Sequence, residues 1–301
     1  MERAQSSFSL SEALFSCLSR RADSHRCSCS RRNGSCNSNQ AQEKTAGRAL
    51  QAIRELAQRG VDLNHQHGLH LPLHVACANG DASAADLLIS LGAEVNLRDG
   101  LHRTPLHYSA EKCEACVRLL LQRGAMVDPR DGQGNSPLHW ACYKNQKEVA
   151  RSLLEAGAHA DLVDSHGDSA LSWACLKGHL DIIRLLLLYG CVPDVRNGSG
   201  STPLSRLAAT IAIGIGSAQE EACLELLLRA LGQLDRRQLS ATVEADAGLA
   251  SLLLPLCSNC RPLKQLCRHA ARRALGAGYL PPKVKQLPIP PSLQQSLLLQ
   301  T

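Results

Sequence analysis

The sequence is poor in aromatic residues and has no long apolar run. Phe, Trp and Tyr make up only 3% of its 301 residues, too few to anchor a β-sandwich core, whereas its Leu and Ala suit packed helices. The longest apolar stretch, residues 207–215, is interrupted by Thr210 and Gly214 and is shorter than the ~20 residues that span a bilayer. Residues 1–7 contain no apolar signal core, so we expect neither secretion nor a membrane partner.

Acidic residues are missing from the C-terminal tail. Residues 255–301 hold 7 basic side chains and no acidic one. These charges alternate with Leu, Ala and Pro instead of forming a dense basic block, so a nucleic-acid partner is not favoured. Without a signal segment, the 14 cysteines of the chain predict reduced thiols and a location in the cytoplasm or nucleus.

Two sequence markers recur along the chain with one common period. The second position of a Thr-Pro-Leu-His-like motif recurs at intervals of 33, 32, 33 and 33 residues, at Pro72, Pro105, Pro137, Ala170 and Pro203. A glycine that follows a Leu-rich run recurs at intervals of 32, 32, 33 and 33 residues, at Gly60, Gly92, Gly124, Gly157 and Gly190. Two markers with one period indicate tandem structural repeats.

Each repeat reads as a pair of short helices. Thr104 is suited to the N-cap of the first helix and Pro105 to its first turn. Gly124 is suited to the left-handed residue that ends the second helix. The second helix carries an apolar stripe at Cys116, Leu119 and Leu120. One such pair cannot bury its apolar face alone, so neighbouring repeats must stack.

The period and the Thr-Pro-Leu-His motif resemble the ankyrin repeat family. The resemblance implies an all-α solenoid of helix-turn-helix repeats with projecting hairpin loops. We expect ankyrin repeats over residues 46–235, with a degenerate first unit, four regular units and a stretched last unit. A flexible N-terminal segment rich in Ser, Cys and Arg is expected over residues 1–45. A connector, 236–251, would then lead to a small helical module, 252–301.

The histidines and tryptophans of the repeats do not indicate an enzyme. His74, His107 and His139 share one repeat position, which predicts a hydrogen-bonding role at the loop–helix junction. Trp140 and Trp173 share another, which favours packing over ligand binding. The sequence also lacks a phosphate-binding loop, a Gly-x-Ser-x-Gly motif and a metalloprotease motif. We expect no catalytic residue and no cofactor.

The C-terminal tail carries two ordered motifs. Residues 261–276 have a helical pattern with an apolar stripe at Leu263, Leu266, Cys267, Ala270, Ala271 and Ala274. Leu263-x-x-x-Cys267-x-x-x-Ala271 is similar to the Elongin B/C-binding box that opens a SOCS box. Downstream, Leu287-Pro288-Ile289-Pro290 is similar to a cullin box. Both motifs, in this order after ankyrin repeats, resemble the ankyrin repeat and SOCS box protein family.

That resemblance implies a substrate-recognition adaptor of an Elongin B/C–cullin–RING ubiquitin ligase. Elongin B and Elongin C would bind Leu263, Leu266, Cys267 and Ala271. A cullin-5 scaffold with its RING-box protein would bind Leu287, Pro288, Ile289 and Pro290. An unidentified protein substrate, held by the ankyrin repeats, would be presented for ubiquitination and proteasomal degradation. The alternative is an ankyrin scaffold or sequestering protein without a ligase role.

Cysteine clusters leave a third interpretation open, zinc or redox regulation. The set Cys257, Cys260, Cys267 and His269 could suggest zinc. However, residues two apart on a helix, such as Cys267 and His269, point to different faces, so no metal site is predicted. The pair Cys113-x-x-Cys116 lies at the junction of two helices, where core or surface thiols are the simpler interpretation.

Overall fold

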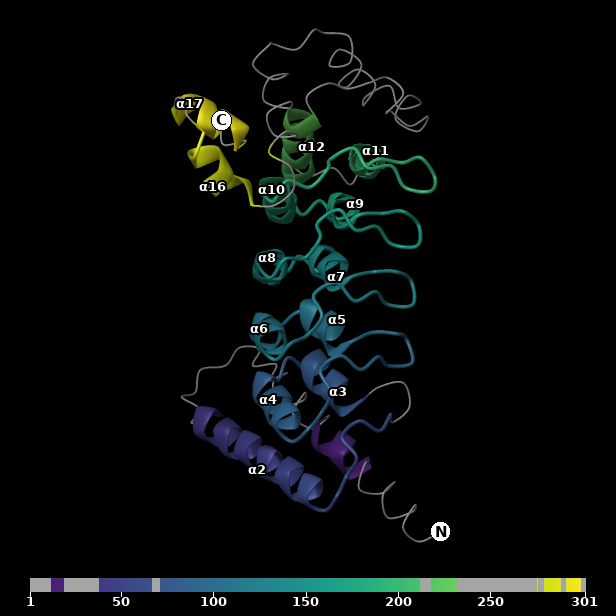
Figure 1. Ribbon diagram of the computed structural model, residues 1–301, viewed down its shortest axis with the longest axis vertical. Helices are drawn as coiled ribbons and strands as arrows, with labels where there is room; N and C mark the ends of the chain where they lie inside the picture. Colours follow the sequence, from purple (N-terminus) through teal and green to yellow (C-terminus); the bar gives the residue numbers. More distant parts are fainter. Residues whose placement is uncertain are drawn as a thin grey trace. The chain divides into compact units, whose positions relative to one another are not determined.

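The computed structural model describes most of the chain (Figure 1). The described residues are 12–18, 38–66, 71–211, 218–231, 275, 279–287 and 291–298. Within these ranges the protein is helical and contains no strand, only an isolated β-bridge between Val163 and Ser169. None of the described helices is long and apolar enough to cross a membrane. The chain falls into two compact units, Met1–Gly132 and Gln133–Thr301.

The first unit contains two regular helix pairs and a longer preceding helix. Its helices are α2 (Ser38–Gln58), α3 (Pro72–Asn79), α4 (Ala82–Ser90), α5 (Pro105–Ala110) and α6 (Glu114–Gln122). The first helices of successive repeats pack together, α3 on α5, and so do the second helices, α4 on α6. This arrangement gives each short helix the neighbours that its apolar face requires.

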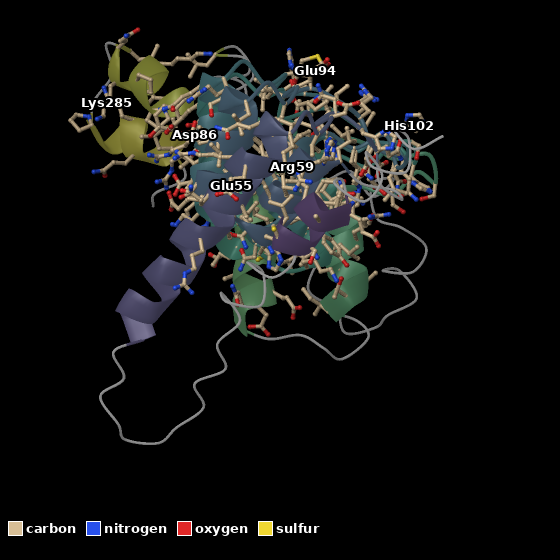
Figure 2. All side chains as sticks on the ribbon, turned by 90° about the horizontal axis from the view of Figure 1, so that it is seen from below. Glu55, Arg59, Asp86, Glu94, His102 and Lys285 are labelled. Carbon is tan, nitrogen blue, oxygen red and sulfur yellow. The ribbon has the colours of Figure 1, made fainter. Side chains whose placement is uncertain are left out.

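An opening helix pair precedes α3 and α4, and part of it lies outside the predicted repeat region. Residues 12–18 are helical, with Leu14 and Leu18 buried. The Asn79 side-chain amide at the end of α3 donates to the Leu18 carbonyl at 3.0 Å. Helix α2 packs against α4, and both its Glu55 and Arg59, which follows the helix, are exposed (Figure 2). Residues 12–18 therefore contact α3, the first helix of the next repeat, and α2 contacts α4, its second helix. These are the contacts that the two helices of a preceding repeat would make.

The second unit continues the same pattern. Its repeat helices are α7 (Pro137–Tyr143), α8 (Lys147–Glu155), α9 (Ala170–Leu176), α10 (Leu180–Leu188), α11 (Pro203–Thr210) and α12 (Ala218–Leu231). Helix α9 packs between α7 and α11, and α10 packs between α8 and α12. Helix α12 has 14 residues against 9 in α10, so much of the extra length of the last repeat lies in its second helix.

The histidines at the loop–helix junctions have the predicted hydrogen-bonding role. The backbone N–H of Ser136 donates to Nδ1 of His139 at 3.2 Å, and Nε2 of His139 lies 3.1 Å from the Asp168 carbonyl of the next repeat. An acceptor at Nδ1 requires the proton on Nε2, so the ring donates to Asp168. The N–H of Thr104 makes the same bond to His107 at 3.0 Å. The ring thus both caps its own helix and joins two repeats.

Glycine ends the second helices as the sequence predicts. Gly124 follows α6 with φ of 83°, and Gly157 follows α8 with φ of 93°. These angles lie in the left-handed region that residues with a Cβ disfavour. The expected class, an all-α chain of helix-pair repeats, is therefore confirmed.

Candidate functional site

Two short helices follow the repeats in the second unit, α16 (Leu280–Lys285) and α17 (Pro291–Leu297). They share an apolar cluster made of Leu280, Val284, Leu297 and Leu298, all at most 7% exposed. Leu188 at the end of α10 packs against this cluster. The rings of Tyr279 and Tyr189 lie 4.7 Å apart. The C-terminal helices are therefore held against the second-helix side of the repeats.

Polar contacts to backbone carbonyls hold the ends of this C-terminal module. The Lys283 ammonium donates to the Leu275 carbonyl at 3.1 Å, and the Gln294 side-chain amide donates to the Leu287 carbonyl at 3.3 Å. Leu287, the first residue of the predicted cullin-binding set, is half-buried and packs against the apolar cluster. Its position places the start of that motif between α16 and α17.

The other residues predicted to bind partners lie outside the described part of the chain. These are Leu263, Leu266, Cys267, Ala271, Pro288, Ile289 and Pro290. Sequence reasoning missed Leu280 and Val284, which form the buried side of α16. Their spacing of four residues is typical of one apolar helix face and could have predicted this role. Pro281 and Pro282 lie between them and favour a turn or the start of a helix, so the sequence did not indicate a helix there.

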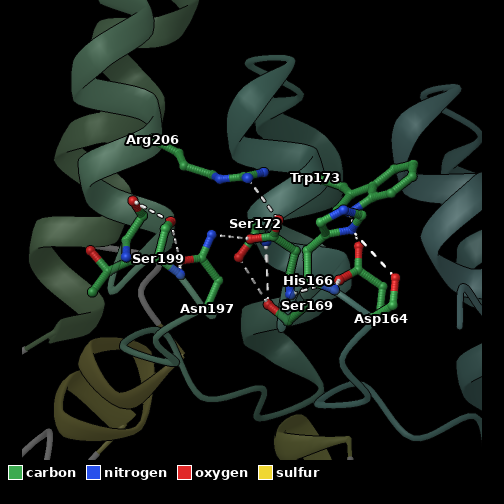
Figure 3. Close-up of polar contacts among 12 residues, drawn as sticks. Asp164, His166, Ser169, Ser172, Trp173, Asn197, Ser199 and Arg206 are labelled. Atoms are coloured by element: carbon green, nitrogen blue, oxygen red, sulfur yellow. Dashed lines mark hydrogen bonds and ion pairs between the residues drawn. The ribbon is translucent and has the colours of Figure 1, made fainter. Parts of the chain in front are cut away.

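The hairpin loops of the second unit are joined by hydrogen bonds (Figure 3). The Gly198 N–H donates to the His166 carbonyl of the preceding loop at 2.7 Å. Within one loop, Asp164 Oδ1 accepts from the backbone N–H of His166 and of Asp168, at 2.8 and 2.9 Å. Its other oxygen, Oδ2, accepts from the Trp173 indole at 3.1 Å. The loop and the first helix behind it are thereby fixed to each other.

Three aromatic side chains gather on the first helices of the second unit. The Trp173 ring lies 5.9 Å from Trp140 and 5.3 Å from Tyr143, with the planes close to perpendicular. All three are half-buried. The exposed ammonium groups of Lys177 and Lys144 lie over the Tyr143 ring, at 4.6 and 5.7 Å from its centre. Packing was the predicted role of the tryptophans, and these contacts confirm it.

This aromatic cluster combines half-exposed π faces with exposed positive charge. Aromatic side chains bury a large area at low entropic cost, and ammonium groups beside them attract carboxylates. The composition suits the docking of a polypeptide that carries both apolar and acidic side chains. It offers no nucleophile paired with a base.

Among the described residues there is no group of three or more His, Cys, Asp or Glu side chains that could hold a metal ion. The residues considered for zinc, Cys257, Cys260, Cys267 and His269, lie outside the described ranges. The described cysteines are all free thiols.

Comparison with known protein families agrees with both the helix-pair repeats and the C-terminal module. The family model for ankyrin repeats in three copies matches residues 73–164, 124–197 and 153–238. The SOCS box model matches residues 259–298. The molecule is thus an ankyrin-repeat protein that carries a SOCS box.

Curated relatives point to the same family. The chain is 46% identical over 98 residues to Ankyrin repeat and SOCS box protein 8 of Mus musculus and of Homo sapiens. The matched region covers 32% of this chain and spans about a third, 34%, of the length of those relatives. This chain belongs to the ankyrin repeat and SOCS box protein family, as the order of its motifs predicted.

Proposed function

We propose that this protein is a substrate-recognition adaptor of an Elongin B/C–cullin–RING ubiquitin ligase. The observation that carries the proposal is the SOCS box match at residues 259–298, directly after ankyrin repeats that extend to residue 238. In this role the chain does not itself catalyse ubiquitin transfer. The repeats hold a protein substrate near the ubiquitin-charged enzyme, and the gain in rate comes from proximity and orientation.

Elongin recruitment falls to the apolar stripe of residues 261–276. Leu263 enters an apolar pocket of Elongin C, and Cys267 packs beside it as a small apolar thiol. Burial of one Leu side chain contributes about 1.5–3 kcal/mol, which corresponds to roughly ten- to hundredfold in affinity. Leu266 and Ala271 complete the contact.

Cullin recruitment falls to Leu287, Pro288, Ile289 and Pro290. Two prolines in four residues stiffen the chain, so an extended edge is presented with little loss of entropy. The partner proposed for it is a cullin-5 scaffold with its RING-box protein, in the cytoplasm. Leu287 packs on the apolar cluster of α16 and α17, which ties the start of this edge to a folded support.

Co-purification with Elongin B/C tests the first contact. Leu263→Asp is expected to abolish it, since a carboxylate replaces the apolar anchor. The matched control is Leu101→Asp, because the Leu101 side chain is 44% exposed on a hairpin loop of the first unit. Absence of Elongin B/C from the purified unaltered protein would refute the adaptor function, whereas Elongin binding that survives Leu263→Asp, or that is lost equally in both variants, would refute the assignment to Leu263.

Cullin association tests the second contact. Replacement of residues 287–290 by alanine is expected to reduce cullin-5 binding and to leave Elongin binding in place. If the unaltered protein binds neither Elongin B/C nor cullin-5, it is the alternative, an ankyrin scaffold or sequestering protein.

The substrate is proposed to dock on the aromatic cluster of Trp140, Tyr143 and Trp173. The exposed cations at Lys144 and Lys177 favour an acidic segment with apolar side chains. The double variant Lys144→Glu, Lys177→Glu is expected to lose the substrate. Under proteasome inhibition, the substrate should be missing from the proteins that co-precipitate with this variant, while Elongin should still co-precipitate. Arg118→Glu, on an exposed face of α6, is the matched charge reversal. An unchanged set of bound proteins in the double variant would place the substrate elsewhere.

A further inference from the structure

The start of helix α6 carries two cysteines that contact each other. Cys113 is the residue just before the helix, and its sulfur accepts the backbone N–H of Cys116 at 3.4 Å. The Cys113 sulfur also lies 3.4 Å from the Gly80 carbonyl of the preceding repeat, to which it donates when protonated. Cys113 is partly exposed, whereas Cys116 is completely buried.

The sulfur of Cys113 occupies a position that a carboxylate occupies one repeat earlier. Asp81 is the residue before α4, and its Oδ1 accepts the Ala84 N–H at 3.0 Å. Both acceptors lie three residues before the N–H that they receive, at the start of a nine-residue helix. The unpaired N–H groups at a helix N-terminus favour a negative charge there. This position therefore stabilises the thiolate of Cys113 as it stabilises the Asp81 carboxylate.

Charged and sulfur groups around Cys113 also favour its thiolate form. The hydrogen bond from the Cys116 thiol is the largest effect, and together with backbone N–H groups and the nearby Lys112 ammonium it lowers the pKa of Cys113 to about 6, although burial opposes the shift. The same hydrogen bond, followed by burial, raises the pKa of Cys116. Cys77 on α3 is also completely buried, and burial raises its pKa as well. The cluster thus holds one thiolate beside protonated thiols.

We propose that Cys113 and Cys116 form a peroxide-oxidisable dithiol, in which Cys113 is the attacking thiolate and Cys116 the resolving thiol. The oxidant is a hydroperoxide such as hydrogen peroxide. In the first step the Cys113 sulfur attacks one peroxide oxygen, the O–O bond breaks, and hydroxide leaves, which gives a sulfenic acid at Cys113. The sulfur is oxidised by two electrons and the peroxide is reduced.

The second step closes a disulfide. The Cys116 sulfur attacks the Cys113 sulfur, the S–O bond breaks, and the oxygen leaves as water with the Cys116 proton. Since the two residues are neighbours across one helical turn, Cys116 needs no access to solvent for this step. A dithiol reductant such as dithiothreitol reverses the reaction by thiol–disulfide exchange.

Other buried cysteines of the chain provide built-in controls. Cys142 and Cys175 occupy the repeat position of Cys77 in α7 and α9, and both are completely buried. They lie inside helices rather than before one, and burial raises the pKa of each thiol. They have neither the exposure nor the stabilising N–H groups of Cys113, so oxidation is expected to spare them.

Alkylation and mass spectrometry of the full-length protein test the proposal. Cys113 is expected to react with iodoacetamide at half its maximal rate at about pH 6, well below the inflection of an ordinary thiol. After limited hydrogen peroxide, a peptide disulfide between Cys113 and Cys116 should appear and should vanish with dithiothreitol. In Cys116→Ala, dimedone should instead trap the sulfenic acid at Cys113.

Two further variants keep the test decisive. Cys113→Asp restores the cap that Asp81 provides, so it is expected to fold and to lose the peroxide-dependent disulfide. Cys142→Ser should leave that disulfide unchanged. An alkylation profile of Cys113 that rises only above pH 8, or peroxide oxidation spread evenly over the cysteines of native protein, would overturn the proposal.

Discussion

His139 offers a quantitative test of how the repeats are joined. Removing the ring in His139→Ala leaves the Ser136 N–H, in a residue only 1% exposed, without its acceptor, which costs about 1–3 kcal/mol. The Asp168 carbonyl loses one donor but keeps the Asp164 N–H at 2.9 Å, so that loss costs only about 0.5–1.5 kcal/mol. The polar part of the change is therefore roughly 1.5–4.5 kcal/mol.

The chain itself shows how to separate these two contributions. Ser205 occupies the same repeat position in α11, and its hydroxyl accepts the Thr202 N–H at 2.8 Å. His139→Ser should thus keep the bond from Ser136 and lose only the bond to Asp168, a cost of about 0.5–1.5 kcal/mol. Both variants lose the same ring volume, so the void left behind cancels when one is compared with the other.

Urea unfolding of the full-length protein, followed by circular dichroism at 222 nm and by tryptophan fluorescence, measures both variants. The Trp173 ring lies 6.0 Å from His139, so fluorescence reports on this junction directly. His139→Ala is expected to be less stable than His139→Ser by about 1–3 kcal/mol. Equal stability of the two variants would refute the reasoning, because the unsatisfied Ser136 N–H would then carry no cost.

Three further predictions concern single contacts. Burial is the largest single effect on the Asp99 carboxyl and acts to raise its pKa, but hydrogen bonds from Tyr108 and from backbone N–H groups together outweigh it, so the pKa of Asp99 is lowered. Tyr108→Phe should raise that pKa, which NMR titration would show. A carboxyl whose pKa is lower in the folded state than in the unfolded state stabilises the fold above its unfolded pKa, and this contribution is lost as the pH falls. Urea unfolding of Tyr108→Phe should therefore show reduced stability at pH 7 but not at pH 2. Gly167 has φ of 82°, and a Cβ there would lie 2.8 Å from the Gly198 backbone nitrogen, so Gly167→Ala should cost at least about 1–2 kcal/mol in urea unfolding. Leu280→Ala empties a completely buried position of α16 and should cost about 2–5 kcal/mol in the C-terminal helices, seen as faster amide hydrogen exchange of Val284.

The repeat core was predictable from sequence because its signals are local and recur. Each of these signals, such as Pro105, Gly124 and the recurring histidines, depends on one hydrogen bond or one backbone angle. The structure has those bonds and angles at the residues that the period predicts. The opening pair was less visible. Residues 12–18 make less than one repeat helix pair and are followed by polar chain, and the first residues of α2, from Ser38, lack an apolar stripe.

The candidate sites were predictable to different extents. The motif spacing predicts that Leu287 belongs to a binding edge, but it does not predict that Leu287 packs against the cluster of Leu280 and Val284, because that contact depends on tertiary structure. The pair Cys113 and Cys116 was visible as a spacing, yet a spacing does not say which thiol caps a helix. Only the bond from the Cys116 N–H to the Cys113 sulfur distinguishes the two.

Differences between repeats show how one junction can replace another. Ser172 stands where His139 stands one repeat earlier, and its side chain is too short to reach the next loop. At that junction Asp168 instead accepts the Asn197 side-chain amide at 3.0 Å and pairs with the Arg206 guanidinium at 2.7 Å (Figure 3). An ion pair with one buried partner is sensitive to loss of either group, because removal of Arg206 leaves the carboxylate without its countercharge. The chain therefore keeps a polar link between these repeats, and Asp168, through its carbonyl on one side and its carboxylate on the other, serves both junctions.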